Sequence, residues 1–390
     1  MKLLFAHDHV FYKYNKQYYS TGGLSKEMLE RYSNIFEEVV VVSRQKEVES
    51  LENKLTLAST DRVTFIRVPD FKSARTYIKI AEAKTIVKKA VKNSDVVIAR
   101  LPSSIGDLVV DAAIKNSKPY LIEVVACPWD AYWNHSIKGK LLAPFMYFSL
   151  KWKVIKSPYT IYVTNNFLQR RYPTKGKSTN CSNVALTEFD DQVLARRLGR
   201  IEGMPNNSKL TIGTTAAVNV KYKGQQYIIE ALGQLKKQGI DNFEYQLVGG
   251  GEQKYLTKVA EKYDVVNQVK FIGVMPHNKV FEWLETVDLY VQPSRQEGLP
   301  RALIEAMSRG IPSFGARTAG IPELLDEKFI FSNTKDNIKQ ICTILKCFDK
   351  TVMKEQAIQN YNEALKYDKQ IIEKRRYDFL EQLRNEIDVL

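Results

Sequence analysis

The stretch LYVQPSRQEGLPRALIEAMSRGIPSFGARTAGIPELL, residues 289–325, decides the fold. Its first apolar residues predict a short buried strand that ends at Gln292. After a loop, Pro300 suits the first turn of a helix, where its missing N–H costs nothing. We expect this helix to begin at Arg301 and to stop at Gly310. A strand–loop–helix unit of this kind predicts a doubly wound α/β sheet, with the helix start at the carboxyl edge of the strands.

Two glutamates flank this predicted helix start. Glu297 lies in the loop just before the helix, and Glu305 lies one turn inside it. The free N–H groups and positive dipole end of a helix start favour an anion such as a diphosphate. A carboxylate accepts two hydrogen bonds at once, so each glutamate can hold a diol of a ribose or a hexose. Taken alone, the pair is better explained as one charge favoured by the helix start and one surface residue.

The rest of the chain repeats this alternation of strands and helices. Val/Ile-rich runs separated by helical stretches predict parallel sheets with helices on both faces. The first unit is predicted to start with KLLFA at Lys2, to continue with a polar loop ending in STGGLS, and to end with TIYVTN at Thr160. The alternation restarts with KLTIGTT at Lys209. Two such units facing each other place the ligand in the cleft between them.

The predicted domain boundaries follow from this alternation. An N-terminal Rossmann-like domain is expected over residues 1–190, and a C-terminal one over residues 208–365. The polar stretch at 187–208 is predicted to be an irregular linker. Residues 366–390 are predicted to form a basic amphipathic helix that packs back on the N-terminal domain. A solvated terminal helix is the alternative for this tail.

The string PS-x-x-EG-x(6)-EAM-x-x-GIP, which leads to GIPELL, resembles the donor-site motif of the retaining GT-B glycosyltransferases of family 4, the glycosyl transferases group 1. Three further landmarks extend the resemblance over the second half: KYKG at 221–224, LVGGGEQKYL at 247–256 and VKFIGVMP at 269–276. The resemblance implies the GT-B fold, two Rossmann-like domains facing a central cleft. It also implies retaining transfer of a hexose or N-acetylhexosamine from a nucleotide-sugar, foremost a UDP-sugar, with no cofactor. Bacterial enzymes of this type build capsule, exopolysaccharide or O-antigen.

The resemblance also assigns roles to residues of the donor site. Glu305 would hold the ribose hydroxyls, and Glu297 would contact hydroxyls of the donor sugar. Lys223 matches the lysine that reaches the diphosphate, where its charge would stabilise the leaving nucleotide. The remaining expected contacts are backbone groups at Gly273, Val274 and Met275 for the base and at Gly298, Leu299 and Leu303 for the phosphates and sugar.

The match to the family is less specific for the glycines and for the second positive charge at the diphosphate. Gly22 and Gly23 match the glycines after the first strand, where absent side chains let the backbone approach the diphosphate. By itself, such a pair indicates only a turn. The arginine that the family places about five residues before its lysine has no counterpart in TTAAVNV at 214–220. The candidates for this second charge are Lys221, Arg295, Arg301 and Arg100.

The sequence predicts no metal site and a reducing compartment. It contains no Asp-x-Asp pair of the kind that holds a divalent ion in transferases of the other main fold. Its four cysteines lack paired metal spacing and are too few for a disulfide framework. The opening MKLLFAHDHVF fits a buried strand better than a signal peptide, and no run approaches the length of a membrane span. We therefore expect a metal-independent cytoplasmic protein.

The acceptor is expected on the first domain, after the predicted strand PYLIEVV. The resemblance implies a polar residue at this strand end, often a histidine, but Val124–Cys127 stands there. Asp130 is the first candidate to receive the acceptor proton, and Glu123 and His135 are less favoured. A role of Asp130 in a turn or cap is an equal alternative. Enzymes of this type are thought to follow a front-face path in which the leaving phosphate helps to take the proton, so a dedicated base is not required.

A strongly basic stretch follows in the same domain. The chain carries a net charge of +14, and residues 131–187 contain nine Lys or Arg and no Asp or Glu. This stretch also contains Trp133, Trp152 and the apolar segment LLAPFMYFSL. Cations interleaved with aromatic rings suit an anionic bilayer, so a peripheral position on the inner face of the cell membrane and a polyprenyl-diphosphate-linked acceptor are hypotheses. A solvated basic helix face is the alternative, and no recognised motif supports nucleic acid.

Two other functions stay open at this point. A GT-B sugar-nucleotide epimerase or phosphorylase would share the donor-site motif. A non-catalytic protein that binds a nucleotide-sugar or nucleic acid would share the charge.

Overall fold

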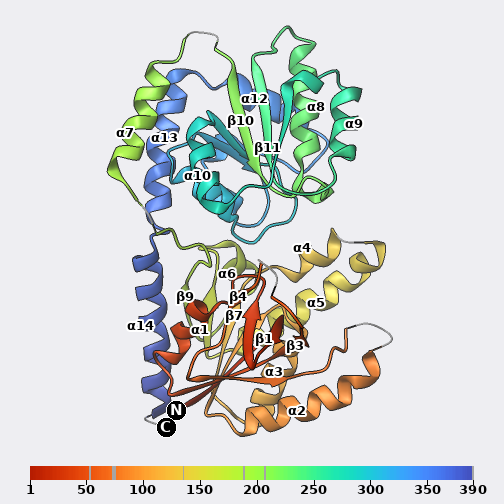
Figure 1. Cartoon of the computed structure of the whole chain (residues 1–390), viewed down its shortest axis with the longest axis vertical. Helices are drawn as coiled ribbons and strands as arrows, with labels where there is room; N and C mark the ends of the chain where they lie inside the picture. Colours follow the sequence, from red (N-terminus) through yellow and green to blue (C-terminus); the bar gives the residue numbers. More distant parts are fainter. Residues whose placement is uncertain (52–53, 73–75, 135, 188, 206–207, 389–390) are drawn as a thin grey trace.

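The computed structural model describes residues 1–51, 54–72, 76–134, 136–187, 189–205 and 208–388. It consists of two α/β units placed one above the other along the long axis (Figure 1). The N-terminus and the end of the last helix lie together at the far end of the first unit. Each unit has its own buried hydrophobic core. The prediction of two Rossmann-like units is confirmed.

The first unit is built on a parallel sheet. Its strands lie in the order β5 (Val63–Arg67), β3 (Glu38–Glu47), β1 (Lys2–Tyr14), β6 (Val96–Leu101), β7 (Tyr120–Val124), β8 (Tyr159–Tyr162) and β9 (Lys177–Asn180). Its helices are α1 (Lys26–Ser33), α2 (Ile80–Lys92), α3 (Ser104–Lys115), α4 (Pro128–Trp133), α5 (Ile137–Lys156) and α6 (Phe167–Arg171). Strands β6 and β7 are buried along their whole length, which explains why their sequences are apolar apart from Arg100 and Glu123, which form an ion pair with each other.

The polar loop predicted after the first strand is wrong, because β1 continues into a hairpin. Strand β1 passes a bulge between Ala6 and Val10 and then pairs with β2 (Gln17–Ser20) in antiparallel fashion. Asn15 and Lys16 form the turn with φ values of 45° and 65°, as a two-residue hairpin turn requires. The hairpin brings the chain back to the loop that holds the predicted glycine pair.

The second unit holds a fully parallel sheet. Its strands lie in the order β12 (Val269–Gly273), β11 (Phe243–Val248), β10 (Leu210–Thr215), β13 (Leu289–Gln292), β14 (Ser313–Ala316) and β15 (Ile330–Phe331). Its helices include α8 (Gln225–Lys236), α9 (Lys254–Lys262), α10 (His277–Thr286), α11 (Arg301–Met307), α12 (Asn337–Lys346) and α13 (Lys350–Leu365). Strand β13 ends and helix α11 begins at the residues predicted from the motif.

The stretch expected to be an irregular linker contains a helix. Helix α7 (Asp191–Glu202) packs on the second unit beside α13 (Figure 1). Buried Arg197 donates hydrogen bonds to the backbone carbonyls of Leu284, Val287 and Arg309. The polar composition of the stretch concealed this helix, because its anchor is itself a charged residue.

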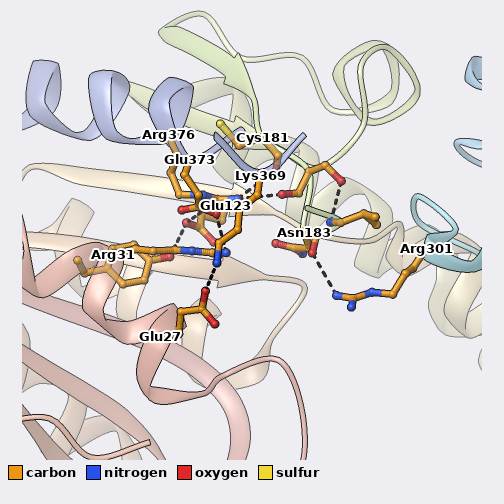
Figure 2. A network of polar contacts seen from close by, with 12 residues as sticks. Glu27, Arg31, Glu123, Cys181, Asn183, Arg301, Lys369, Glu373 and Arg376 are labelled. Carbon is orange, nitrogen blue, oxygen red and sulfur yellow. Dashed lines mark hydrogen bonds and ion pairs between the residues drawn. The ribbon is translucent and has the colours of Figure 1, made fainter. Parts of the chain in front are cut away.

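Helix α14 (Lys369–Asp388) runs along the first unit (Figure 1). Its apolar face joins the core of that unit through Ile372, Phe379, Leu380 and Leu383. Figure 2 shows the polar side of the same contact. Arg376 lies 3.5 Å from the carboxylate of Glu123 on β7, which also forms an ion pair with Arg100 at 3.1 Å and accepts a 2.6 Å hydrogen bond from Tyr32.

Candidate donor and acceptor site

The donor loop, residues 293–300 between β13 and α11, places Glu297 opposite a lysine from another part of the second unit. Lys223 Nζ lies 2.7 Å from Glu297 Oε1, although 74 residues separate the two. Gln292, the last residue of β13, donates a 3.0 Å hydrogen bond to the same oxygen. Both members of the pair are mostly buried. The structure therefore brings together two of the residues that the motif assigned to the donor sugar and diphosphate.

Gly224 explains why a glycine follows this lysine. It adopts a φ of 81°, and a Cβ there would lie 1.9 Å from the carbonyl oxygen of Pro293. The backbone N–H of Arg295 also donates a 2.7 Å hydrogen bond to the carbonyl of Tyr222. The segment that carries Lys223 and the loop that carries Glu297 are thus in direct backbone contact.

The variant Gly224→Ala is expected to weaken nucleotide-sugar binding and to lower the melting temperature. The new methyl group has to displace Pro293, which moves Lys223 away from Glu297. Gly239→Ala is the matched control, since its φ is 77° and nothing lies within 4 Å of the added Cβ. Both variants carry a left-handed strain of about 1 kcal/mol, and only Gly224→Ala adds the clash. Equal melting temperatures in thermal denaturation would contradict this account of the glycine.

Glu305 has a partner that the sequence did not predict. Its side chain is buried within the first turns of α11, and Oε1 lies 2.8 Å from Nε2 of His277 at the start of α10. Because a carboxylate only accepts, Nε2 carries the proton of this hydrogen bond. The imidazole itself is mostly exposed. The only sequence signal was the position of His277 directly after the VKFIGVMP landmark.

The other predicted backbone contacts lie around this pair. Gly273 adopts a φ of 87°, and its carbonyl accepts a 2.9 Å hydrogen bond from Gly249. Val274 is exposed, whereas the side chain of Leu303 is buried in the core. Gly298 faces the first unit, since a Cβ on it would lie 3.2 Å from the carbonyl oxygen of Val125.

The predicted glycine pair lies on the first unit. Gly22 and Gly23 are exposed, and the N–H of Gly22 donates a 3.2 Å hydrogen bond to Ser20 Oγ. The same hydroxyl lies 2.8 Å from Nε2 of His9. Within the described ranges, neither glycine forms a hydrogen bond with the second unit. Nothing lies within 4 Å of a Cβ added at either glycine, so the backbone there is open to a ligand.

Two histidines of the β1 bulge were not selected from the sequence. Burial, aided by Arg100, lowers the pKa of His7 to about 4. Burial, aided by Arg44, lowers the pKa of His9 to about 4 as well. Both imidazoles are therefore neutral at neutral pH. The sequence offered only a His-Asp-His string at a strand end, which gave no sign of the bulge.

A cavity of about 700 Å³ lies between the two units, beside α4, α5 and α6 of the first unit. Aromatic side chains of the first unit form much of its wall, and residues from Ala319 to Glu323 of the second unit complete it. Glu323 accepts hydrogen bonds from the N–H groups of Asn165 at 2.7 Å, Asn166 at 3.0 Å and Phe167. The last part of the GIPELL motif thus holds the two units together.

Asp130 lies on α4 beside this cavity. Its carboxylate is 3.6 Å from Nη2 of Arg171, and no contact in the described part of the chain joins it to Glu297 or Lys223. Glu123 was one of the two less favoured candidates to receive the acceptor proton, and this prediction is wrong. Its carboxylate is 2% exposed and is held by Arg100 and Arg376. His135, the other one, lies outside the described residues.

Comparisons with known proteins identify the family of this chain. The family model for glycosyl transferases group 1 matches residues 205–361. Protein CapJ of Staphylococcus aureus is 33% identical over 363 residues, which cover 91% of this chain and 88% of CapJ. The chain belongs to the glycosyl transferases group 1 family.

Two further comparisons place this glycosyltransferase among its relatives. The putative colanic acid biosynthesis glycosyltransferase WcaL of Escherichia coli K12 is 37% identical over 111 residues, 27% of each chain. The structure of Anabaena HepE in complex with UDP-glucose has a TM-score of 0.62 at 16% identity, over 98% of this chain and 100% of that one. The predicted GT-B fold is confirmed.

Two of the four candidates for the second phosphate charge have partners in the first unit. Arg100 is buried and already paired with Glu123, and it donates a 2.9 Å hydrogen bond to Asn183. Arg301, the first residue of α11, donates a 3.3 Å hydrogen bond to the carbonyl of Asn183 (Figure 2). Asn183 thus connects the start of α11 to the buried ion pair of Arg100 and Glu123 in this glycosyltransferase.

The other two candidates lie over aromatic rings. The guanidinium of Arg295 lies 4.3 Å from the ring centre of Tyr227, and Nζ of Lys221 lies 4.8 Å from that of Tyr255. Arg295 stays beside the lysine loop because of its backbone hydrogen bond to Tyr222. Arg301 and Arg295 therefore remain the candidates nearest to the donor loop.

Proposed function

We propose that this glycosyltransferase transfers a hexose or an N-acetylhexosamine from a UDP-sugar with retention of configuration and without a metal ion. The observation that carries the proposal is the Lys223–Glu297 pair, which lies at the carboxyl edge of the second sheet, just before helix α11. HepE shares the fold and has been solved with UDP-glucose, so UDP is the nucleotide that we propose first for the donor.

The proposed reaction uses charge rather than a metal. The bond between the sugar C1 and the diphosphate oxygen breaks, and the acceptor hydroxyl oxygen forms a bond to C1 on the same face. The acceptor proton passes to the leaving diphosphate. Lys223 and the N–H groups at the start of α11 stabilise the negative charge of that leaving group, and Glu297 orients the sugar. We propose Asp130 as the side chain that assists this proton transfer.

Donor class, stereochemistry and metal dependence can be tested separately. Thermal shifts with UDP-, GDP-, ADP- and dTDP-sugars are expected to be largest for a UDP-sugar. Slow hydrolysis of that donor, followed by proton NMR, should release the sugar first as the anomer present in the donor. EDTA should leave the rate unchanged. Release of the opposite anomer would refute retention, and loss of activity in EDTA that divalent metal restores would refute metal independence.

We further propose a lipid-linked glycan acceptor, used in cell-surface polysaccharide synthesis at the inner face of the membrane. One face of α5 exposes a stripe of large apolar side chains at helical spacing, between 48% and 82% exposed: Ile137, Leu141, Phe145, Phe148 and Trp152. Lysines accompany the stripe, with Lys156 3.8 Å from the Trp152 ring centre. Such a face suits an anionic bilayer surface. Within the described residues, no helix is long and apolar enough to cross a bilayer.

Replacing Leu141 and Phe145 of this stripe with serine is expected to weaken binding to anionic vesicles at least tenfold. Each side chain loses a large part of the roughly 1.5–3 kcal/mol that its full burial contributes. Vesicle co-sedimentation with phosphatidylcholine and phosphatidylglycerol at 7:3 measures the change. The control replaces Ile358 and Ile371, which are about half exposed on α13 and α14. An equal loss in both double variants would count against a specific membrane face.

A further inference from the structure

The cavity between the units has a largely aromatic wall on the first-unit side. Trp129 comes from α4, Tyr147 and Phe148 come from α5, and Phe167 comes from α6. Trp129 and Tyr147 pack edge to face, with ring centres 6.0 Å apart. A cavity of about 700 Å³ lies within the size range of small-molecule sites. This wall suits an apolar chain more than an ion alone.

The charged groups of the cavity differ in how many ion-pair and hydrogen-bond partners they have within the protein. Arg171 lies near Asp130 and within 6.0 Å of three aromatic ring centres. The carboxylate of Glu323 is occupied by three backbone N–H groups. Arg170 is exposed and has no ion-pair partner in the part of the chain that the structure describes. Arg170 is therefore the cation that is free to bind an added anion, and a guanidinium binds phosphate through two parallel hydrogen bonds.

The two ends of the cavity lead to different surroundings. On the second unit, Gly320 donates a 2.9 Å hydrogen bond to the carbonyl of Gly298 in the donor loop. On the first unit, Phe148 lines the cavity and also belongs to the exposed stripe of α5. A ligand that spans the cavity thus reaches from the neighbourhood of the donor loop to the stripe.

We infer that this cavity binds the junction between phosphate and isoprenoid chain in a polyprenyl-diphosphate-linked glycan acceptor. Arg170 holds the phosphate, and the aromatic wall holds the first isoprene groups, which leave past Phe148 toward the membrane. The inference rests on the proposed lipid-linked acceptor. It deepens that proposal by assigning a site and a residue that recognises the acceptor's phosphate.

Vesicles that differ only in their anionic lipid test the assignment. One set contains phosphatidylcholine with 5 mol % polyprenyl phosphate, and the other contains phosphatidylcholine with phosphatidylglycerol adjusted to the same surface potential. Wild-type protein is expected to bind the first set about tenfold more tightly, the size of one charge-assisted hydrogen-bonded contact. Arg170→Gln should remove this preference and change binding to the phosphatidylglycerol set less than twofold.

The matched control is Lys175→Gln, which removes another exposed cation of the same basic stretch and should keep the preference. Equal binding of both vesicle sets by wild-type protein, or an unchanged preference in Arg170→Gln, would overturn the inference. UDP-induced thermal shifts of the same variants report separately on the donor site. If the proposed donor chemistry is wrong, the thermal shifts with UDP will show it. If the cavity does not bind the acceptor, only the vesicle-binding measurements will show it.

Discussion

Replacing Lys223 with alanine is expected to lower kcat for sugar transfer about 10²- to 10³-fold, because the leaving diphosphate loses a preorganised positive charge. The fold should survive, since the side chain lies at the site and not in a core. Steady-state kinetics with the donor that gives the largest thermal shift measure the effect. Lys237→Ala, at the exposed end of α8, is the control and should keep normal turnover.

The same experiment on Glu297 separates charge balance from catalysis. If the lysine and glutamate only neutralise each other, replacing both by alanine would restore activity. If the lysine stabilises the leaving group and the glutamate orients the sugar, Glu297→Ala should also lower kcat strongly, and the double variant should not recover activity. Turnover within threefold of wild type in both single variants would refute this assignment of the site.

Replacing Glu123 with glutamine is expected to destabilise the first unit by about 3–5 kcal/mol. The change leaves the guanidinium groups of Arg100 and Arg376 buried without their shared counter-charge. A loss of this size lowers the melting temperature by about 10 °C for a domain of this length. Differential scanning calorimetry measures the shift, and α14 should separate from the first unit at lower temperature.

An exposed ion pair between α14 and the same unit supplies the control. Glu27→Gln removes the partner of Lys369 (Figure 2) and should cost no more than about 1 kcal/mol, because solvent screens this pair. Burial opposes ionisation of Glu123, but Arg100 and Arg376 outweigh it and hold the pKa of this carboxyl below its usual range. The stability that the ionised Glu123 carboxylate contributes is therefore lost as the pH falls through that lowered pKa. The difference in melting temperature between wild type and Glu123→Gln should accordingly become smaller in acid. Equal melting temperatures of the Glu123 and Glu27 variants at neutral pH would contradict the role of the network.

The sequence predicted the parts of the donor site that are local in the chain. Pro300 and Arg301 mark the helix start in one continuous motif, and the structure confirms that start, whereas the helix ends at Met307, before the stop predicted at Gly310. The family resemblance assigned Lys223 and Glu297 to one donor, but it did not predict the ion pair between them. No periodicity within a short window relates two residues so far apart.

The features that escaped prediction depend on contacts between distant segments. His277 and Glu305 meet because α10 and α11 pack together, and neither segment alone indicates this. Glu123 and Arg376 are 253 residues apart, so a glutamate inside an apolar strand gave no sign of its partner. The hairpin after β1 depended on a bulge, which interrupts the alternation that identifies strands.

The most direct test of the central claim, that the edge around Glu297 and Glu305 is the nucleotide-sugar site, is a calorimetric titration with UDP. Wild-type protein should bind one UDP. Glu305→Gln should bind it at least tenfold more weakly, because the ribose hydroxyls lose hydrogen bonds to a charged acceptor. The exposed control Glu282→Gln should bind as wild type does. An equal affinity of Glu305→Gln and wild type, or no binding of UDP by the wild-type protein, would contradict the account.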